Sequence, residues 1–129
     1  MSELINLERC AAYLAARATL AAVHRVAGRW PPDLADRAQR AAVDAVHLTA
    51  TAVSYATGTA GRRQCLREAI TSAVGVAAFV DAASAMGFGA EPLEPTAPSL
   101  TRAQRVAGRT IALLGLLLHA SAPMSVDHG

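Results

Sequence analysis

The sequence predicts an all-α protein that folds as an antiparallel up-down-up-down four-helix bundle. Apolar residues recur at spacings of three and four in four long segments, which is the period of an amphipathic helix. Alanine supplies much of the 53% apolar content, and it favours helix and lets helices approach closely. Glycine and proline separate the segments, and no convincing strand occurs. Because 129 residues are enough for one core, we expect a single bundle domain over residues 1–119.

The first helix is predicted over residues 3–27, with Ser2 as its N-cap. Gly28 ends this helix, and the sequence Trp30-Pro31-Pro32 makes the turn that follows. The main apolar seam of this helix, at three-four spacing, consists of Leu4, Leu7, Ala11, Leu14, Ala18 and Ala21. Further apolar residues lie off this seam, so more than one face of the helix is apolar.

The second helix is predicted over residues 32–56, and its polar and apolar sides are cleanly divided. Asp33 and Asp36 lie in the first turn, where carboxylates interact favourably with the helix dipole. Asp36–Arg40 and Arg40–Asp44 are both i,i+4 pairs, so the polar side is largely self-neutralised. The opposite, apolar side consists of Ala38, Ala42, Ala45, Val46, Thr49, Ala52 and Val53.

The third helix is predicted over residues 62–86, after a glycine-punctuated turn at residues 57–61. Residues 87–98 contain three prolines and form a predicted linker. The core face of the third helix is predicted to consist of Leu66, Ala69, Ile70, Ala73, Val76, Ala77 and Val80.

The fourth helix is predicted over residues 100–119, beginning at Ser99 or Thr101, and Thr101 with Gln104 makes a capping-box pattern. From residue 111 to residue 118 the helix is apolar nearly all round, whereas a helix of a four-helix bundle needs only one apolar stripe. This excess suggests contact between subunits. Residues 120–129 are predicted to form a disordered tail.

Charged residues are scarce, which bears on assembly and on partners. They make up 17% of the chain, against roughly 25% in typical soluble domains. Such a chain either hides surface in an oligomer, which we expect, or is an alanine-rich monomer. All twelve cations are arginines, which indicates either a GC-rich genome or bidentate contact with phosphate or carboxylate. The formal net charge of +2 is a weak argument for nucleic-acid binding.

The sequence indicates a cytoplasmic protein that is not embedded in a membrane. Cys10 and Cys65 form no CxxC motif and are typical of small buried residues in a reducing compartment. The first residues lack the basic start and apolar run of a signal peptide. Residues 69–90 are long enough to span a bilayer but contain Asp81, and residues 110–120 reach only half a span. We interpret both stretches as buried helices.

No group of residues in the sequence indicates catalysis, so we expect a protein that is not an enzyme and has no cofactor. None of the five glutamates has a histidine three residues later, as bundles with two iron ions require. The four histidines have no partner at metal-ligand spacing, and we expect no metal site. Glycine-rich phosphate loops, a nucleophile elbow and a local Cys–His signature are also absent from the sequence.

Two groups of arginines are candidates for binding phosphate. Arg62, Arg63 and Arg67 lie at the start of the third helix, where the helix dipole disfavours them unless an anion or carboxylates meet them. The second group lies on the fourth helix, where none of its three arginines has an acidic residue at the i,i+4 spacing. The alternative for both groups is a solvated face, or ion pairs with a neighbouring helix or subunit. The second group consists of Arg102, Arg105 and Arg109.

Several stretches resemble a family of bacterial four-helix bundle proteins. The stretch from Trp30-Pro31-Pro32 to Ala45 is similar to the second-helix signature of that family. The family includes proteins encoded in intervening sequences of large ribosomal RNA genes and the accessory variability determinant of diversity-generating retroelements. Other similar stretches are Gly61-Arg62-Arg63-Gln64, Ala85-Met86-Gly87-Phe88, and Leu100 to Leu118 with Arg102, Arg105, Gly108 and Arg109.

The resemblance implies a homopentamer whose subunits are up-down bundles. In the retroelement branch, a basic surface contacts nucleic acid and a reverse transcriptase. The chain departs from one branch at residues 48–52, where the intervening-sequence proteins have an Asn-Ile-Ala-Glu-Gly type of stretch, and from the other because its charge is nearly balanced. Basic residues of the family correspond here to Arg37, Arg40, Arg62, Arg63 and Arg67.

The sequence therefore predicts a non-catalytic homo-oligomer, an accessory factor that binds RNA, DNA or an enzyme of the reverse-transcriptase type through arginine-rich surfaces. Because only five residues are aromatic, such binding would be directed at the nucleic-acid backbone and would have little sequence specificity. The alternative is a structural or protein-interaction module with no nucleic-acid role.

Overall fold

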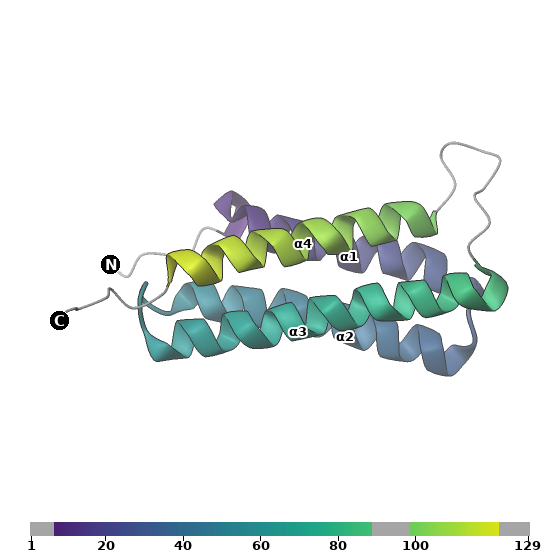
Figure 1. Cartoon of the computed structure of the whole chain (residues 1–129), viewed down its shortest axis with the longest axis horizontal. Coiled ribbons are helices and arrows are strands. Elements are labelled where there is room, and N and C mark those ends of the chain that lie inside the picture. The colour runs from purple at the N-terminus through teal and green to yellow at the C-terminus, as the bar shows by residue number, and fades with distance from the viewer. Residues whose placement is uncertain (1–6, 89–98, 122–129) are drawn as a thin grey trace.

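The computed structural model describes residues 7–88 and 99–121, which form a four-helix bundle (Figure 1). The short helices η1 and η2 precede and follow the first long helix, and the π-helical turn η3 follows the third; they cover Leu7–Arg9, Ala27–Arg29 and Ser84–Phe88. No strand occurs in the described ranges, so the predicted all-α class is confirmed. The long helices are α1 (Ala11–Val26), α2 (Pro32–Ser54), α3 (Ala60–Ala83) and α4 (Leu100–Ala120).

The helix bounds lie within three residues of the predicted ones except at the start of α1. The predicted helix over residues 3–27 is interrupted at Cys10, whose backbone is extended at φ −92° and ψ 107°, so that α1 begins only at Ala11. The predicted cap Ser2 lies outside the described residues, as do residues 89–98 of the predicted linker and residues 122–129 of the predicted tail.

The N-caps of α3 and α4 explain where these helices begin. The Thr59 side chain accepts a hydrogen bond from the backbone N–H of Arg62 at 3.2 Å, so α3 starts two residues earlier than predicted. Ser99 caps α4 in the same way, accepting from the backbone N–H of Arg102 at 3.2 Å. The N-cap is therefore Ser99, and the capping-box pattern that begins at Thr101 does not mark the start of the helix.

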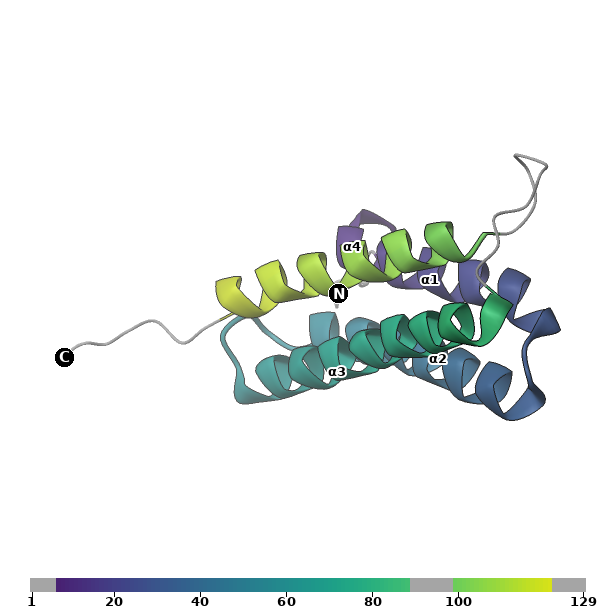
Figure 2. The same cartoon turned by 45° about the vertical axis from the view of Figure 1, so that its right-hand side comes forward.

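Each long helix packs against two neighbours, and the bundle has two layers. The contacting pairs are α1 with α2, α2 with α3, α3 with α4, and α4 with α1. Figure 1 shows α1 and α4 in one layer and α2 and α3 in the other. The connection from α1 to α2 lies at one end of the bundle, together with the last turn of α3 and the first turn of α4, and the α2–α3 turn lies at the opposite end (Figure 2).

The core has two apolar clusters, one toward each end of the bundle. One surrounds Trp30, which the α1–α2 turn buries among residues of all four helices, and the other surrounds Leu66 and Leu114. Between the clusters, the buried hydroxyls of Thr19 on α1 and Thr110 on α4 lie 2.9 Å apart. Both hydroxyls also bond to backbone carbonyls of their own helices, so these buried polar groups are satisfied.

Most of the core is alanine. Among the described residues, fourteen of the twenty-one buried apolar residues are alanines. The predicted core faces of α2 and α3 are confirmed, because their buried positions are all predicted ones except Ala83 at the end of α3. Alanine side chains bury little apolar area each, so the helices must pack closely over their whole length to form a stable core.

The main apolar seam predicted for the first helix, called the α1 seam from here on, does not face the core. The buried residues of α1 follow a different line, whereas Ala11, Leu14 and Ala21 of the seam are exposed and Ala18 is half-buried. Leu14 is 42% exposed and Leu116, in the predicted all-apolar part of α4, is 66% exposed. The single chain thus leaves apolar surface of both α1 and α4 uncovered. The buried residues of α1 are Ala12, Ala15, Ala16, Thr19, Ala22 and Val23.

The alanine core predicts a specific sensitivity to larger side chains. Ala42 is 0% exposed, so Ala42→Leu should lower the free energy of unfolding by about 1–3 kcal/mol because the added methylene groups find no space. The matched control Ala78→Leu makes the same change at an exposed position of α3 and should stay within about 0.5 kcal/mol of the wild type. Urea unfolding followed by circular dichroism measures both values. Equal stability of the two variants would contradict close packing at Ala42.

Candidate nucleic-acid interface

The two candidate arginines of α2 are held in ion pairs on the surface. Arg37 Nε lies 3.2 Å from Asp33 Oδ2, and Arg40 Nε lies 3.1 Å from Asp36 Oδ2. The predicted Asp36–Arg40 pair is confirmed, but Arg40 makes no ion pair with Asp44. The Asp33–Arg37 pair has the same i,i+4 spacing, which could have revealed it in the sequence. Because all four side chains are more than half exposed, the pairs add little stability, but they offset the charge of both arginines locally.

Arg62 and Arg63 bind the turn between α2 and α3. Arg62 Nη1 donates a hydrogen bond to the Tyr55 carbonyl at 3.2 Å, and Arg63 Nη1 donates to the Gly58 carbonyl at 2.7 Å. Both carbonyls lie in the turn that follows α2, outside the hydrogen bonds of the helix itself, and a backbone carbonyl needs a donor. From the sequence we expect an anion or carboxylates beside these arginines at the start of α3. In the structure, Arg62 and Arg63 instead donate hydrogen bonds to backbone carbonyls.

Arg62 also connects this turn to the end of α4. Its Nε donates to the Ser121 hydroxyl at 3.0 Å, and Ser121 is buried. The preceding Gly61 lets the Tyr55 ring lie against the first turn of α3, because a Cβ at this position would come within 2.7 Å of Tyr55 Cε1. The stretch Gly61-Arg62-Arg63 thus has a structural role at this end of the bundle. These contacts explain the adjacent arginines at the start of α3 without a bound ligand.

Arg67, the third arginine of this group, is exposed at the rim of a shallow groove. The groove lies between α2 and α3, has a volume of about 380 Å³, and will be called the α2–α3 groove. Within it, Gln64 Nε2 donates a hydrogen bond to Glu68 Oε2 at 2.8 Å. Apart from Leu48, its lining is polar. The lining residues are Leu48, Gln64, Arg67, Glu68, Thr71 and Ser72.

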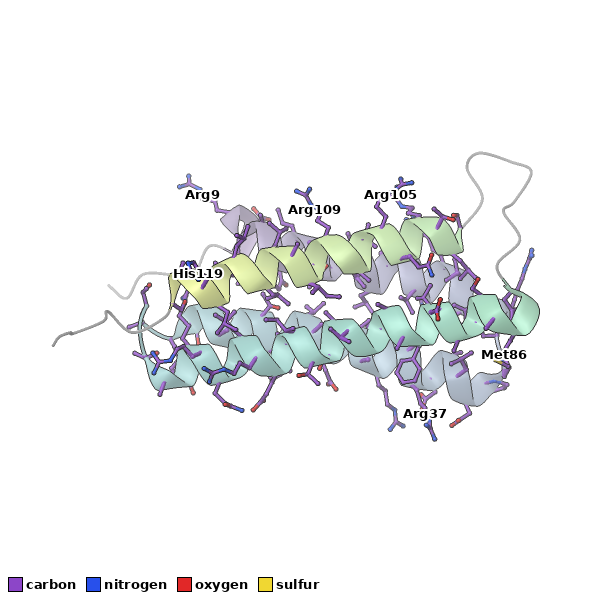
Figure 3. The ribbon with its side chains drawn as sticks, in the orientation of Figure 1. Arg9, Arg37, Met86, Arg105, Arg109 and His119 are labelled. Carbon is purple, nitrogen blue, oxygen red and sulfur yellow. The ribbon has the colours of Figure 1, made fainter. Side chains whose placement is uncertain are left out.

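The arginines of α4 form an exposed row, which we call the α4 row (Arg102, Arg105 and Arg109). Arg105 and Arg109 project from the same side of the bundle as Arg9 of η1, whereas Arg37 projects from the opposite side (Figure 3). Among the described residues, the arginines of the α4 row make no ion pair. The structure therefore brings three unneutralised guanidinium groups onto one face.

Charges are sorted between the two layers of the bundle. Helices α1 and α4 contain five arginines and no aspartate or glutamate, a formal charge of +5. Helices α2 and α3 contain five arginines and five carboxylates, a formal charge of 0. The net charge of the whole chain conceals this contrast, which appears only when α1 and α4 are known to be neighbours. The arginines of the first layer are Arg17, Arg25, Arg102, Arg105 and Arg109.

The arrangement can bind anions through exposed guanidinium groups. Each guanidinium offers five N–H donors that fit the oxygens of a phosphate in a bidentate way. Within the part of the chain that the structure describes, no three His, Cys, Asp or Glu side chains lie close enough to hold a metal ion. Exposed His24 is 3.0 Å from the Gln39 side-chain oxygen through Nδ1, a contact that joins α1 to α2.

One helical stretch in the described ranges is long and apolar enough to cross a membrane. It covers Ala60–Phe88, with a mean hydropathy of 1.6 in the best window, of which 28% is buried. A core helix of a soluble protein that passes this test of length and composition is mostly buried, whereas less than a third of this window is. The expectation that this stretch is a buried helix is therefore wrong for its described part: α3 buries one stripe against α2 and α4 and exposes the rest.

The contacts of Arg62 predict a structural role that Arg67 does not share. Arg62→Ala should lower the free energy of unfolding by about 1–2 kcal/mol, since two hydrogen bonds of a partly buried arginine are lost. It should also speed amide exchange at Ser121, because the end of α4 loses its tie to the turn. Arg67→Ala, an exposed arginine one turn further along α3, is the control and should change stability by less than about 0.5 kcal/mol. Chemical unfolding and hydrogen exchange give both readouts, and an unchanged Arg62→Ala protein would contradict this role.

Comparisons with protein-family models, with curated proteins and with solved structures found no match for this chain. No family is therefore identified, and the resemblance to the intervening-sequence and retroelement accessory proteins stays a prediction from sequence.

Proposed function

We propose that this protein is a non-catalytic, homo-oligomeric helical bundle that binds nucleic acid, or a nucleic-acid enzyme of the reverse-transcriptase type, through its arginine-rich surface. The observation that carries the proposal is the sorting of charge. Helices α1 and α4 contain five arginines and no carboxylate, and the α4 row is exposed and makes no ion pair with any described residue. A face of this kind attracts a polyanion even though the whole chain is almost neutral.

Phosphate groups are the ligand that best fits the α4 row. Its three arginines recur at positions i, i+3 and i+7, so one helix face presents them to the same partner. Contacts of arginine with phosphate oxygens position a protein on nucleic acid without reading its sequence. Because few aromatic side chains are available to stack on bases, we expect binding with little preference for base sequence.

Assembly and topology are further parts of the proposal. The order in which the helices contact one another, together with the alternating directions of the four helices in Figure 1, supports an antiparallel up-down-up-down topology. Exposed Leu14 and Leu116 support a homo-oligomer, and the sequence resemblance suggests a pentamer. We further propose a single bundle domain over residues 1–119 and a cytoplasmic location, because the four helices pack against one another and Cys10 and Cys65 are free thiols, which suit a reducing compartment.

A structural or protein-interaction module is the second candidate function. It is favoured by the contacts of Arg37, Arg40, Arg62 and Arg63, because each of these four candidate arginines already has a partner within the chain. If these contacts describe the general use of arginine in this protein, the α4 row would meet carboxylates of a protein partner instead of phosphates.

Binding across a salt series separates the two functions. The wild-type protein should bind a mixed pool of RNA and DNA with an affinity that falls steeply with salt, because each phosphate contact releases counterions. Replacing Arg102, Arg105 and Arg109 together by alanine should reduce the slope of log K against log salt by about 2 to 3, since each contact contributes roughly 0.7 to 0.9.

The matched control is the double variant Arg37→Ala/Arg40→Ala, which removes two exposed arginines that are paired with aspartates. Its slope should stay close to that of the wild type. An absence of binding at low salt, or an unchanged slope in the triple variant, would reject the nucleic-acid role of the α4 row and favour the protein-interaction module.

A further inference from the structure

We propose that the nucleic-acid surface of this protein spans two helices, with Arg25 of α1 beside the α4 row, and that its partner is a double-stranded nucleic acid. The inference rests on the proposed function and deepens it. It adds an arginine outside the candidate groups named from the sequence, and it names the kind of nucleic acid. The duplex is held by both of its phosphate backbones, one on each helix.

Arg25 lies on the flank of α1 that is next to α4. His24 contacts Gln39 of α2 through Nδ1, so it marks the α2 flank of α1. Successive helical residues are turned by about 100°, so His24 is turned by about 140° from the buried Thr19 in one direction and Arg25 by about 120° in the other. Because α1 packs against α2 and α4, the flank of Arg25 is the one beside α4.

Arg25 is also at the same height along the bundle as the first part of the α4 row. The hydroxyls of Thr19 and Thr110 lie 2.9 Å apart and fix the register of α1 against α4. Figure 1 shows these neighbouring helices running in opposite directions. At 1.5 Å per residue, Arg25 is about 9 Å from this contact, and Arg105 and Arg102 are about 7.5 Å and 12 Å from it toward the same end. The arginines of the two helices thus lie side by side.

The arginines of this surface are open to solvent and not neutralised. Figure 3 shows Arg9, just before α1, projecting from the same side of the bundle as Arg105 and Arg109 of α4, so both helices contribute to this side. Arg25 is exposed and makes no ion pair or side-chain hydrogen bond with any described residue. Neither α1 nor α4 contains a carboxylate that would repel a phosphate.

Arg17 is an exposed arginine of α1 on the other flank of the helix. It lies seven residues before His24, so these two residues share the flank beside α2. Its guanidinium carbon is 6.0 Å from the centre of the Tyr13 ring, a cation–π contact within the helix. Arg17 therefore has the charge and exposure of Arg25 without its place beside the α4 row, and it provides a matched control.

Two rows of arginines fit the two backbones of a duplex. Packed helices have axes about 8–10 Å apart, so Arg25 and the α4 row are held side by side at roughly this spacing. The grooves of B-form DNA are about 6 Å and 12 Å wide, and each has a phosphate backbone on both of its rims. A spacing between these widths lets long arginine side chains reach both rims of one groove. A single strand has one line of phosphates and engages one row.

The aromatic content of α1 and α4 also favours a duplex. Proteins that bind single strands stack the bases on aromatic side chains. Over residues 11–26 and 100–120, which the structure describes in full, the one aromatic residue is Tyr13, and it lies on the flank of Arg17. The bases of a duplex are already stacked on one another, so phosphate contacts suffice to hold it.

Binding of matched ligands across a salt series tests the inference. The ligands are a short DNA duplex, an RNA duplex and an RNA–DNA hybrid of the same length, and each single strand. The proteins are the wild type, Arg25→Ala, the control Arg17→Ala and the conservative variant Arg25→Lys. Both positions are exposed, so all variants should keep the helix content of the wild type by circular dichroism. Fluorescence anisotropy gives the affinities.

We expect the wild type to bind duplexes more tightly than single strands. Arg25→Ala should reduce the slope of log K against log salt by about 0.9 on duplexes, the contribution of one phosphate contact, which is a loss of roughly five- to tenfold in affinity at about 0.1 M salt. Its slope on single strands should not change. Arg17→Ala should keep both slopes, and Arg25→Lys should keep the duplex slope because its charge remains.

Equal effects of Arg25→Ala and Arg17→Ala on duplex binding would overturn the inference, because only the overall charge would then matter. Equal affinity for duplexes and single strands would overturn it as well. The proposed function stands in both cases if the variant without the α4 row loses binding. A wild type that binds no nucleic acid at low salt overturns both. A preference among the DNA, RNA and hybrid duplexes supports the inference and identifies the source of the phosphates.

Discussion

Close approach of helices across alanine is the constraint on which the rest of this structure depends. Small side chains bury little area each, so stability must come from contact along four long helices and from a few large anchors such as Trp30, Leu66 and Leu114. A narrow core also has no room for every large apolar side chain of the sequence. Leu14 and Leu116 are among the large apolar side chains that stay exposed on the described bundle.

The arginines serve two different physical purposes. Where a helix ends, unpaired carbonyls need donors, and Arg62 and Arg63 supply them at the α2–α3 turn. On the outer face of α4, no carbonyl or carboxylate of the described chain meets the guanidinium groups, and they remain available to a partner. Arginine suits both purposes, because its planar group bonds carbonyls, carboxylates and phosphates with several donors at once.

Charge is distributed unevenly between the two layers of the bundle. Helices α1 and α4 contain five arginines and no carboxylate, whereas the arginines and carboxylates of α2 and α3 balance. Two copies of the first layer would repel each other, and the same charge would attract a polyanion. This contrast arises because packing makes α1 and α4 neighbours.

The sequence by itself determined the fold class, the bounds of α2, α3 and α4 to within three residues, and the buried faces of α2 and α3, because a strong 3.6-residue period and clear turn residues leave little choice. It did not determine which apolar face of α1 is buried, since two faces of that helix are apolar and only the neighbouring helices select one. The partners of Arg62 come from Tyr55 and from Ser121, the latter 59 positions away, so only the tertiary structure could reveal them. The separation of charge between the layer of α1 and α4 and the layer of α2 and α3 was likewise decided by packing. The net charge of a sequence does not say which helices become neighbours.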